Sequence, residues 1–305
     1  MINTIVIGAN GFIGANLCKY LVSRGIFVYA VVRNEKSDIS RLKNLVKTEM
    51  LKIVYSDMHD LRELENEFLN VSVDVLYYLA WQGVTGESRA DYEMQLDNVK
   101  CLCDAVIFAR NIKCQRFVGA GTMAEIDVNN YSGLDGSTPN PVSAYGVAKL
   151  SAHYLSKAMC CQHGIEHVWA YISNTYGEGD SSSNFINFAI NTLKSSKPND
   201  FTQGEQYYDF VNVKDIAQGL YCLGARGKNC YSYYIGSGDS RKLREYIEII
   251  RDAIDPTIEL NLGAIPYNGI LTPRETFDCN KITKDTGYKP EILFEQGIKD
   301  LINHE

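Results

Sequence analysis

A tyrosine and a lysine four positions apart form the clearest candidate for proton-transfer chemistry in this sequence. Tyr145 and Lys149 give the pattern Y-x-x-x-K, and residues with this spacing lie on one face of a helix, one turn apart. A phenol with its ordinary pKa of about 10 exchanges protons slowly at neutral pH, and a nearby ammonium lowers that pKa by stabilising the phenolate. The pair therefore indicates a general acid or base. The alternative interpretation is a partly exposed contact on a helix surface.

The position of the pair favours the catalytic interpretation. It begins a predicted helix, follows a turn-rich segment at 138–143 and lies downstream of Thr122, which comes just after a predicted strand. In an open parallel sheet, ligands bind beyond the carboxyl ends of the strands. Each strand end of this sequence is therefore a candidate wall of a site.

A glycine-rich turn near the N-terminus predicts a phosphate-binding loop. The apolar run at 5–7 is typical of a buried parallel strand, and Gly8, Gly11 and Gly14 follow it with the spacing G-x-x-G-x-x-G before an amphipathic helix that ends at Gly25. Glycines let backbone N–H groups approach a pyrophosphate at the start of a helix, where the helix dipole favours an anion. The alternative interpretation is a purely structural turn between strand and helix.

The composition of the 305 residues excludes several classes of protein. Hydrophobic residues make up 45% of the chain, enough for a sizeable core, and the net charge of −7 argues against nucleic acid or an anionic membrane as the main partner. No apolar run is long enough to cross a membrane, and the N-terminus lacks the features of a signal peptide, so we expect a cytoplasmic protein. The nine cysteines lack the spacing of metal ligands, which favours reduced thiols and no metal site.

Strands and helices alternate along the first part of the chain. We expect apolar strands at 5–8, 26–32, 51–55, 73–79, 116–121 and 167–172, with helices that include 61–69, 92–110 and 143–161. This order predicts an α/β fold with a doubly wound parallel Rossmann sheet. Residues 1–173 are then a dinucleotide-binding Rossmann domain, with segments returning to it near 207–236.

Beyond residue 175 the pattern becomes irregular. Polar segments at 178–183 and 195–206 interrupt it, and a strand–helix unit at 210–223, a strand at 233–235 and helices at 241–254 and from near residue 294 follow. We therefore expect residues 174–305 to form a smaller, mixed α/β substrate-binding lobe.

These motifs together resemble the extended short-chain dehydrogenases/reductases, the NAD(P)-dependent nucleotide-sugar epimerase/dehydratase family. Residues 174–177 are similar to its N-x-Y-G motif, residues 204–215 to G-x-x-x-R-D-F-x-x-V-x-D, and Pro273-Arg274 to its C-terminal substrate segment. G-T-x-x-E at 121–125 looks most like the 4-ketoreductase branch. Two family arginines are missing, since Tyr208 replaces the Arg of R-D-F and Tyr171 stands where an Arg usually precedes the Asn of N-x-Y-G.

The resemblance implies a role for each matched residue. Tyr145 would exchange a proton with the substrate oxygen, Thr122 would hydrogen-bond that oxygen, and Lys149 would tune Tyr145 and hold the nicotinamide ribose. The implied cofactor-binding residues are Gly8, Asn10, Gly11, Phe12, Ile13, Gly14, Arg33, Asp57, Met58, Leu79, Ala80, Trp81, Tyr145 and Lys149, and the implied substrate-binding residues are Thr122, Asn174, Tyr208 and Arg274. Asp57 has the alternative interpretation of a turn or capping residue, and Asn174 that of a loop-stabilising residue.

The end of the second strand bears on the choice of cofactor. An NAD site normally has an acidic residue there, which accepts hydrogen bonds from the adenosine ribose. Here Arg33 occupies that place and no carboxylate precedes Glu35, so the sequence predicts NADP, with NAD still possible. Arg33 can attract a 2′-phosphate and stack on the adenine, and Lys36 adds positive charge. The alternative interpretation of Arg33 is an exposed loop cation.

Three functions remain in competition. The first is NADPH-dependent reduction of a keto group on a 4-keto-6-deoxysugar linked to a nucleoside diphosphate, and the second is an NAD-dependent nucleotide-sugar 4-epimerase. The third is a non-enzymatic dinucleotide sensor, which the intact Thr122, Tyr145 and Lys149 set disfavours. A 4,6-dehydratase is also disfavoured, because Met123 and Ala124 stand where that branch has adjacent Asp and Glu.

The helices at 92–110 and 143–161 also predict how the chain assembles. Apolar residues lie on more than one side of them, including Leu102, Val106 and Ile107 on the first and Leu150, Tyr154 and Leu155 on the second. An additional apolar stripe indicates a second buried face, and in the resembled family the corresponding helices form a four-helix bundle between two copies. We therefore expect a homodimer, with packing inside one chain as the alternative.

Overall fold

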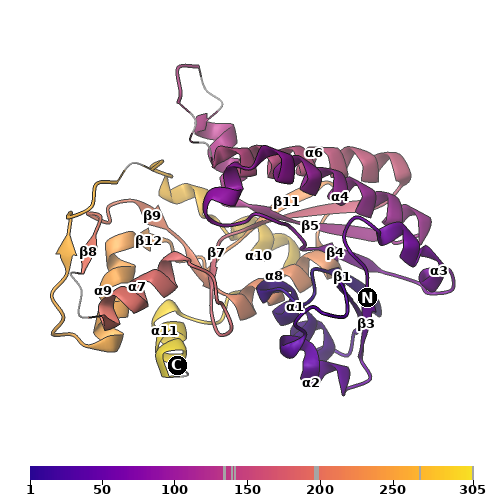
Figure 1. Ribbon diagram of the computed structural model, residues 1–305, viewed down its shortest axis with the longest axis horizontal. Helices are drawn as coiled ribbons and strands as arrows, with labels where there is room; N and C mark the ends of the chain where they lie inside the picture. The colour runs from indigo at the N-terminus through magenta and orange to yellow at the C-terminus, as the bar shows by residue number, and fades with distance from the viewer. Residues whose placement is uncertain (133–134, 139, 141, 196–198, 268, 304–305) are drawn as a thin grey trace.

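A seven-stranded parallel sheet forms the centre of the molecule, with the strand order β11-β6-β5-β4-β1-β2-β3 (Figure 1). The computed structural model describes residues 1–132, 135–138, 140, 142–195, 199–267 and 269–303. The strands are β1 (Asn3–Ile7), β2 (Phe27–Val32), β3 (Leu51–Tyr55), β4 (Val75–Tyr78), β5 (Arg116–Thr122), β6 (Glu166–Ile172) and β11 (Tyr231–Ile235). The predicted doubly wound Rossmann sheet is confirmed.

Helices cover both faces of this sheet. On one face lie α4 (Tyr92–Asn111) and α6 (Ser143–His163), and on the other lie α1 (Phe12–Ser23) and α8 (Val213–Arg226) (Figure 1). Successive residues of β1 serve the two layers, because Ile5 and Ile7 pack with α4 and α6 whereas Val6 packs with α1 and α8. Burial on both sides explains why residues 5–7 of this strand are all apolar. Within the described residues, no helix has both the length and the apolar character needed to cross a bilayer.

A second group of elements forms the smaller lobe. Its helices are α7 (Phe185–Lys194), α9 (Leu243–Ile254) and α11 (Phe294–Asn303), and its short strands are β7 (Asn174–Tyr176), β8 (Asp200–Phe201), β9 (Tyr207–Tyr208), β10 (Phe210–Asn212), β12 (Arg241–Lys242) and β13 (Asn261–Leu262). They share a core that includes Ile190, Phe210, Ile247 and Ile298. Between these elements, α8 and β11 return to the central sheet, and α10 (Asn280–Thr286) packs on both of them.

Three details differ from the expectations. Strand β5 ends at Thr122, one residue beyond the expected end at Gly121, and the ring of Trp169 occupies the space that a side chain at Gly119 or Gly121 would need. The segment expected as one helix at 61–69 begins as a 3-10 helix, Leu61–Leu64, and continues as α3 (Glu65–Phe68). Helix α7 was not predicted, although its buried residues Ile186, Ala189, Ile190 and Leu193 have helical spacing.

Two acidic residues of the motif at 204–215 bind the protein itself. The Asp215 carboxylate accepts hydrogen bonds from the backbone N–H groups of Glu291 and Ile292, at 3.0 and 3.1 Å, and so fixes the segment before α11 to α8. The buried Asp209 carboxylate accepts hydrogen bonds from the Tyr234 hydroxyl and from Ser237. Each carboxylate therefore connects segments of the chain that are far apart in the sequence.

Candidate active site

Thr122 and Tyr145 meet at the carboxyl end of β5. Thr122 is the last residue of β5 and caps α5 (Met123–Asp127), where its side-chain oxygen accepts a hydrogen bond from the Ala124 N–H at 3.3 Å. Tyr145 lies in the first turn of α6, where burial raises the pKa of its phenol, and the Thr122 side chain is near enough for that hydroxyl to lower the pKa of Tyr145 in part. The structure thus brings together two of the three residues predicted to act on the substrate.

A buried carboxylate beneath Thr122 holds this arrangement. Glu125 has no exposed surface, and it accepts hydrogen bonds from the Thr122 N–H at 2.8 Å and from the Trp169 indole N–H at 3.1 Å. His153 Nδ1 lies 3.4 Å from the same carboxylate. A Cβ at Gly121 would stand 2.2 Å from the Trp169 indole nitrogen and 2.6 Å from Glu125 Oε1. Packing around one buried acid therefore explains the G-T-x-x-E pattern at 121–125.

Lys149 is directed to other partners than the phenol. Its Nζ donates a hydrogen bond to the Ala120 carbonyl at 2.9 Å and lies 3.8 Å from the ring centroid of Trp81. Only 6% of the residue is exposed, and burial lowers the pKa of Lys149 to about 7 against the opposing effect of Glu125. The Lys149 side chain thus packs against Trp81, which lines the cofactor cavity described below.

Trp81 links the lysine, the phenol and the loop after β4. Its ring meets the Tyr145 ring edge-on, with the centroids 6.3 Å apart, and its indole N–H donates to Gln95 Oε1 at 2.8 Å. The backbone of Gln82 is held by Asn98 through hydrogen bonds of 2.8 and 2.9 Å. Polar side chains of α4 therefore fix this loop against the candidate catalytic residues.

A cavity of about 460 Å³ lies beside the glycine-rich turn, where the sequence predicts the cofactor. Eight of the predicted residues line it, namely Gly8, Asn10, Gly11, Arg33, Met58, Leu79, Ala80 and Trp81. Ile7, Val31, Ser37, Asp38, Ser56 and Gln82 also line it and were not predicted. Phe12, Ile13, Gly14, Asp57, Tyr145 and Lys149 are absent from its lining.

The glycines shape this cavity by allowing close backbone contacts. Gly8 has a φ of +83°, and a Cβ there would lie 2.9 Å from the Ala80 backbone nitrogen. A Cβ at Gly14 would lie 2.2 Å from the Gly8 carbonyl oxygen. Gly14 therefore lets α1 pack closely against the turn, without lining the cavity itself. The resulting cradle, at the start of α1, fits the pyrophosphate of a dinucleotide.

Arg33 and Asp38 are charged residues of the cavity lining, and further charged side chains lie next to Arg33. The Arg33 side chain is 58% exposed, and its Nε lies 3.5 Å from Asp57 Oδ2. His59 bridges two acids, with one ring nitrogen on Asp57 and the other 2.7 Å from Asp97. Burial would raise the pKa of Asp57, but hydrogen bonds from His59 and the charge of Arg33 lower it overall. The Asp38 carboxylate accepts hydrogen bonds from the Ser40 N–H and hydroxyl, at 2.8 and 3.0 Å.

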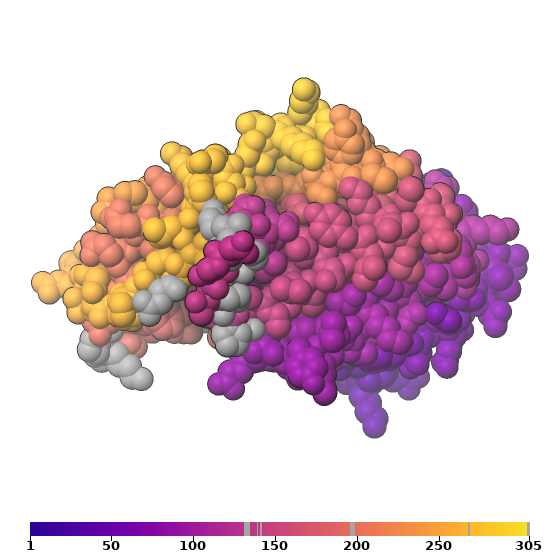
Figure 2. Space-filling model, turned by 90° about the horizontal axis from the view of Figure 1, so that it is seen from above, coloured from indigo at the N-terminus to yellow at the C-terminus, as the bar shows by residue number. Residues whose placement is uncertain are grey.

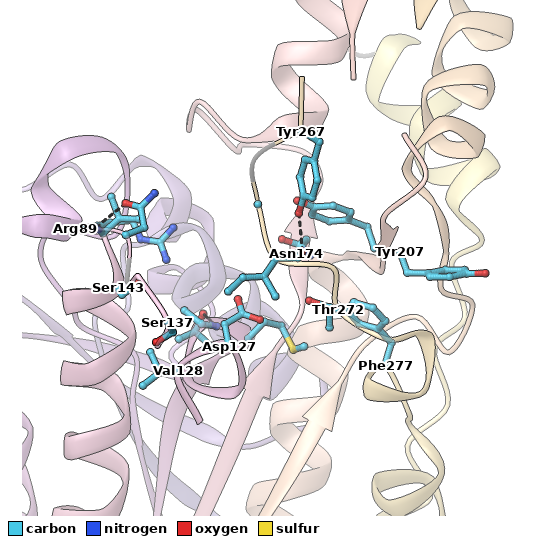
Figure 3. Close-up of a pocket in the computed structure, with 18 of the residues that line it drawn as sticks. Arg89, Asp127, Val128, Ser137, Ser143, Asn174, Tyr207, Tyr267, Thr272 and Phe277 are labelled. Carbon is cyan, nitrogen blue, oxygen red and sulfur yellow. Dashed lines mark hydrogen bonds between the residues drawn. The ribbon is translucent and has the colours of Figure 1, made fainter. Parts of the chain in front are cut away.

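A second cavity, of about 550 Å³, opens between the sheet and the smaller lobe (Figure 3). Of the four residues that the sequence predicts to bind substrate, Thr122, Asn174 and Tyr208 line this cavity and Arg274 does not. Arg274 is exposed at the surface, where its guanidinium carbon lies 5.9 Å from the ring centroid of Tyr207, a wall residue. Arg274, which the sequence predicts to bind the diphosphate, therefore lies outside the cavity lining and next to Tyr207.

The lobe side of this cavity is rich in phenols. Tyr208 lies beside Tyr267, whose hydroxyl donates to the Ile270 carbonyl at 2.7 Å. Burial raises the pKa of Tyr208, so its hydroxyl stays protonated at neutral pH and can donate a hydrogen bond. The Asn174 side-chain N–H donates to the Asp209 carbonyl at 3.4 Å, which gives that residue a loop-stabilising contact as well as a place in the wall.

Two charged residues of the wall were not predicted. Arg89, in the 3-10 helix Gly86–Ala90 after β4, lies over the Tyr145 ring, and Asp127 ends α5. Both follow strands whose carboxyl ends face the site, which is the signal that could have indicated them. They lie several residues beyond the strand ends, in segments without a periodic pattern.

Comparisons with known proteins agree with this geometry. A model of the NAD dependent epimerase/dehydratase family matches residues 4–236, more than half of the chain. The chain belongs to this family. It is therefore an enzyme of the extended short-chain dehydrogenase/reductase type, in a family whose members modify nucleotide sugars in an NAD(P)-dependent manner.

Individual members of the family align with nearly the whole chain. The dTDP-4-dehydro-6-deoxyglucose reductase of Escherichia coli is 24% identical over 319 residues, which cover 98% of this chain and 96% of that protein. The UDP-N-acetylglucosamine 4-epimerase of Methanobrevibacter ruminantium M1, solved with UDP-N-acetylmuramic acid, has a TM-score of 0.82 at 21% identity and covers 99% of this chain and 97% of its own. DesIV, a dTDP-glucose 4,6-dehydratase of Streptomyces venezuelae solved with NAD and TYD bound, has a TM-score of 0.80 at 20% identity, with 99% and 96% covered.

Proposed function

We propose that this enzyme uses NADPH to reduce a keto group on a 4-keto-6-deoxysugar linked to a nucleoside diphosphate. The observation that carries the cofactor choice is Arg33, the only basic residue among the described residues that line the dinucleotide cavity. Its guanidinium can bind a 2′-phosphate, which an acidic residue at that place would repel. NADPH in turn suits net reduction.

The candidate catalytic residues have distinct tasks in such a reduction. Thr122 hydrogen-bonds the keto oxygen and orients it, and Tyr145 donates the proton that this oxygen gains. Lys149 holds the nicotinamide ribose. NADPH, when bound, supplies the hydride. Support for these roles comes from the effect of the nearby Thr122 side chain on the pKa of Tyr145 and from the place of Thr122 in the wall of the second cavity.

The second cavity supports a nucleotide sugar as the substrate. Its volume of about 550 Å³ falls within the range of about 300–1,000 Å³ that is usual for small-molecule sites. Polar side chains such as Asn174, Asp127 and Thr272 can hydrogen-bond sugar hydroxyls, and the Tyr208 hydroxyl can donate to a phosphate. The similarity to the E. coli 4-keto-6-deoxysugar reductase favours the same substrate class for this chain.

A 4-epimerase that retains NAD is the second candidate. Asp38 favours it, because this acidic residue lines the same cavity as Arg33 and can accept hydrogen bonds from a ribose without a 2′-phosphate. The hydrogen bonds from Ser40 engage both oxygens of that carboxylate, and we therefore give Arg33 the greater weight.

Steady-state kinetics with NADPH and NADH separates the two candidates. We expect the wild type to have the higher kcat/KM with NADPH and Arg33→Asp to lose or reverse that preference. Lys47→Asp is the matched control, because it makes the same charge change at an exposed residue outside the cavity lining, and it should keep the preference. Equal use of both cofactors by the wild type would overturn the proposal.

We also propose a homodimer formed through the outer face of α4 and α6, which Figure 2 shows side by side. Leu102 and Val106 do not contribute to that face, because both are buried in the core of the chain itself. The exposed apolar residues of the two helices are Tyr92, Leu96, Val147, Tyr154 and Leu155.

For the domains, we propose residues 1–173 as the dinucleotide-binding unit, with returning segments near 207–236, and residues 174–305 as the substrate lobe.

A further inference from the structure

Arg89 makes an unusual contact with the candidate proton donor. Its guanidinium carbon lies 4.6 Å from the ring centroid of Tyr145. Its Nε is buried and has no hydrogen-bond partner among the described residues, which is uncommon for a buried polar group and places a donor at the site. Figure 3 shows Arg89 entering the cavity from the side of Ser143, across from Tyr207 and Tyr267.

The other cation close to the phenol is engaged elsewhere. Lys149 donates to the Ala120 carbonyl and stacks on Trp81, and its lowered pKa of about 7 leaves it largely neutral above that pH. Arginine stays protonated throughout the physiological range. Arg89 is therefore the cation that is both charged and in contact with the Tyr145 ring.

We propose that Arg89 is a positioning residue that holds the Tyr145 ring by stacking on it and stabilises the phenolate form of that residue. A guanidinium over an aromatic face is attracted to the ring, and the attraction grows when the phenol loses its proton and the ring becomes anionic. This role is additional to that of Lys149. It applies both when Tyr145 gives up its proton and when it takes one back.

Other charged groups act on the same phenol. Burial raises the pKa of Tyr145, the nearby Thr122 hydroxyl and the charge of Arg89 oppose that rise, and Glu125 on α5 adds to it. Asp127 lies in the wall of the same cavity. An opposite charge within about 4–6 Å typically moves a pKa by about 1–3 units, and Arg89 is half-buried, so an effect of about 1 unit is expected.

Titration of Tyr145 tests the proposal without any substrate. Ultraviolet absorbance of tyrosinate is recorded after rapid pH jumps, before the protein unfolds, and each protein is compared with its own Tyr145→Phe counterpart so that the difference reports Tyr145 alone. We expect Arg89→Gln to raise the pKa of Tyr145 by about 1 unit. Arg89→Met, which keeps the apolar stem over the ring, should do the same, and it replaces the first variant if that one does not fold.

Two controls separate charge from structure. Arg89→Lys keeps a positive charge and should shift the pKa less than either neutral variant. Arg24→Gln removes another arginine that lies over a tyrosine, Tyr20, with 5.1 Å between guanidinium carbon and ring centroid, and it should leave the titration of Tyr145 unchanged. An unchanged pKa in both Arg89→Gln and Arg89→Met would overturn the proposal.

The kinetic consequence rests on the proposed function, in which Tyr145 transfers the proton. The limb of the pH profile of kcat/KM that reports Tyr145 should then move upward by about 1 unit in Arg89→Gln. A shifted titration with an unshifted kinetic limb would contradict the role of Tyr145 in the reaction and leave the electrostatic contact standing, so the two failures are distinguishable.

Discussion

Replacing Lys149 by methionine should stabilise the protein while it destroys activity. The pKa of Lys149 falls from 10.5 to about 7 because the side chain is buried, a change of about 3.5 units. At about 1.4 kcal/mol per unit, the buried ammonium destabilises the folded state by about 5 kcal/mol near pH 6. Methionine fills a similar volume without charge, but it leaves the Ala120 carbonyl without the lysine's hydrogen bond, at about 1–3 kcal/mol.

The pH dependence gives this prediction its sharpest form. The lysine binds more protons in the unfolded state between about pH 7 and pH 10.5, so its destabilising effect is complete below the folded pKa and fades as the pH rises toward the unfolded value. The linkage relation gives about 5 kcal/mol near pH 6 and about 2 kcal/mol near pH 9. The stability advantage of Lys149→Met over the wild type should therefore shrink by about 2–3 kcal/mol across this range.

Urea denaturation of nucleotide-free protein at the two pH values measures this change directly. Lys214→Met is the matched control, because it makes the same substitution at an exposed lysine of α8, and its difference from the wild type should not depend on pH. A stability difference for Lys149→Met that is equal at both pH values would refute the reasoning. Weaker dinucleotide binding and lost turnover should accompany the stabilisation, since Lys149 would hold the ribose.

Three other predictions concern catalysis, cofactor binding and assembly. Tyr145→Phe should lower kcat by about 10²–10⁴-fold and leave the dinucleotide Kd nearly unchanged, because only the transferable proton is lost; near-normal kcat would remove it as the proton donor. Dinucleotide binding should change the fluorescence of Trp81, which lines the cofactor cavity, and Trp81→Phe should abolish a change that the fully buried Trp169 cannot supply. Light scattering should give a dimer for the wild type and a monomer for Leu155→Glu, with Leu69→Glu, an exposed leucine outside α4 and α6, as the dimeric control; a monomeric wild type would contradict the proposed interface.

The sequence predicted those parts of the site that local signals determine. Strand ends, the glycine turn and the start of α6 each have a local pattern, so Gly8, Thr122 and Tyr145 were placed correctly relative to the sheet. The spacing of Tyr145 and Lys149 predicted a shared helix face. It could not indicate that the Lys149 ammonium would pack on the indole ring of Trp81.

Contacts between distant segments were the parts that the sequence could not supply. Arg89 contacts Tyr145 from the loop after β4, which Gln95 and Asn98 of α4 hold by hydrogen bonds, and nothing in the loop's own sequence indicates that contact. Arg274 matched a motif, yet its final position depends on how Tyr207 packs in the smaller lobe.

The stoichiometry of cofactor use tests the central claim most directly. Purified enzyme is supplied with NADPH and a panel of nucleoside-diphospho-4-keto-6-deoxysugars, and both the NADPH consumed and the reduced sugar formed are quantified. Our account predicts one NADPH oxidised for each sugar reduced. Conversion of a nucleotide sugar to its 4-epimer by enzyme that retains NAD, with no net consumption of cofactor, would contradict it.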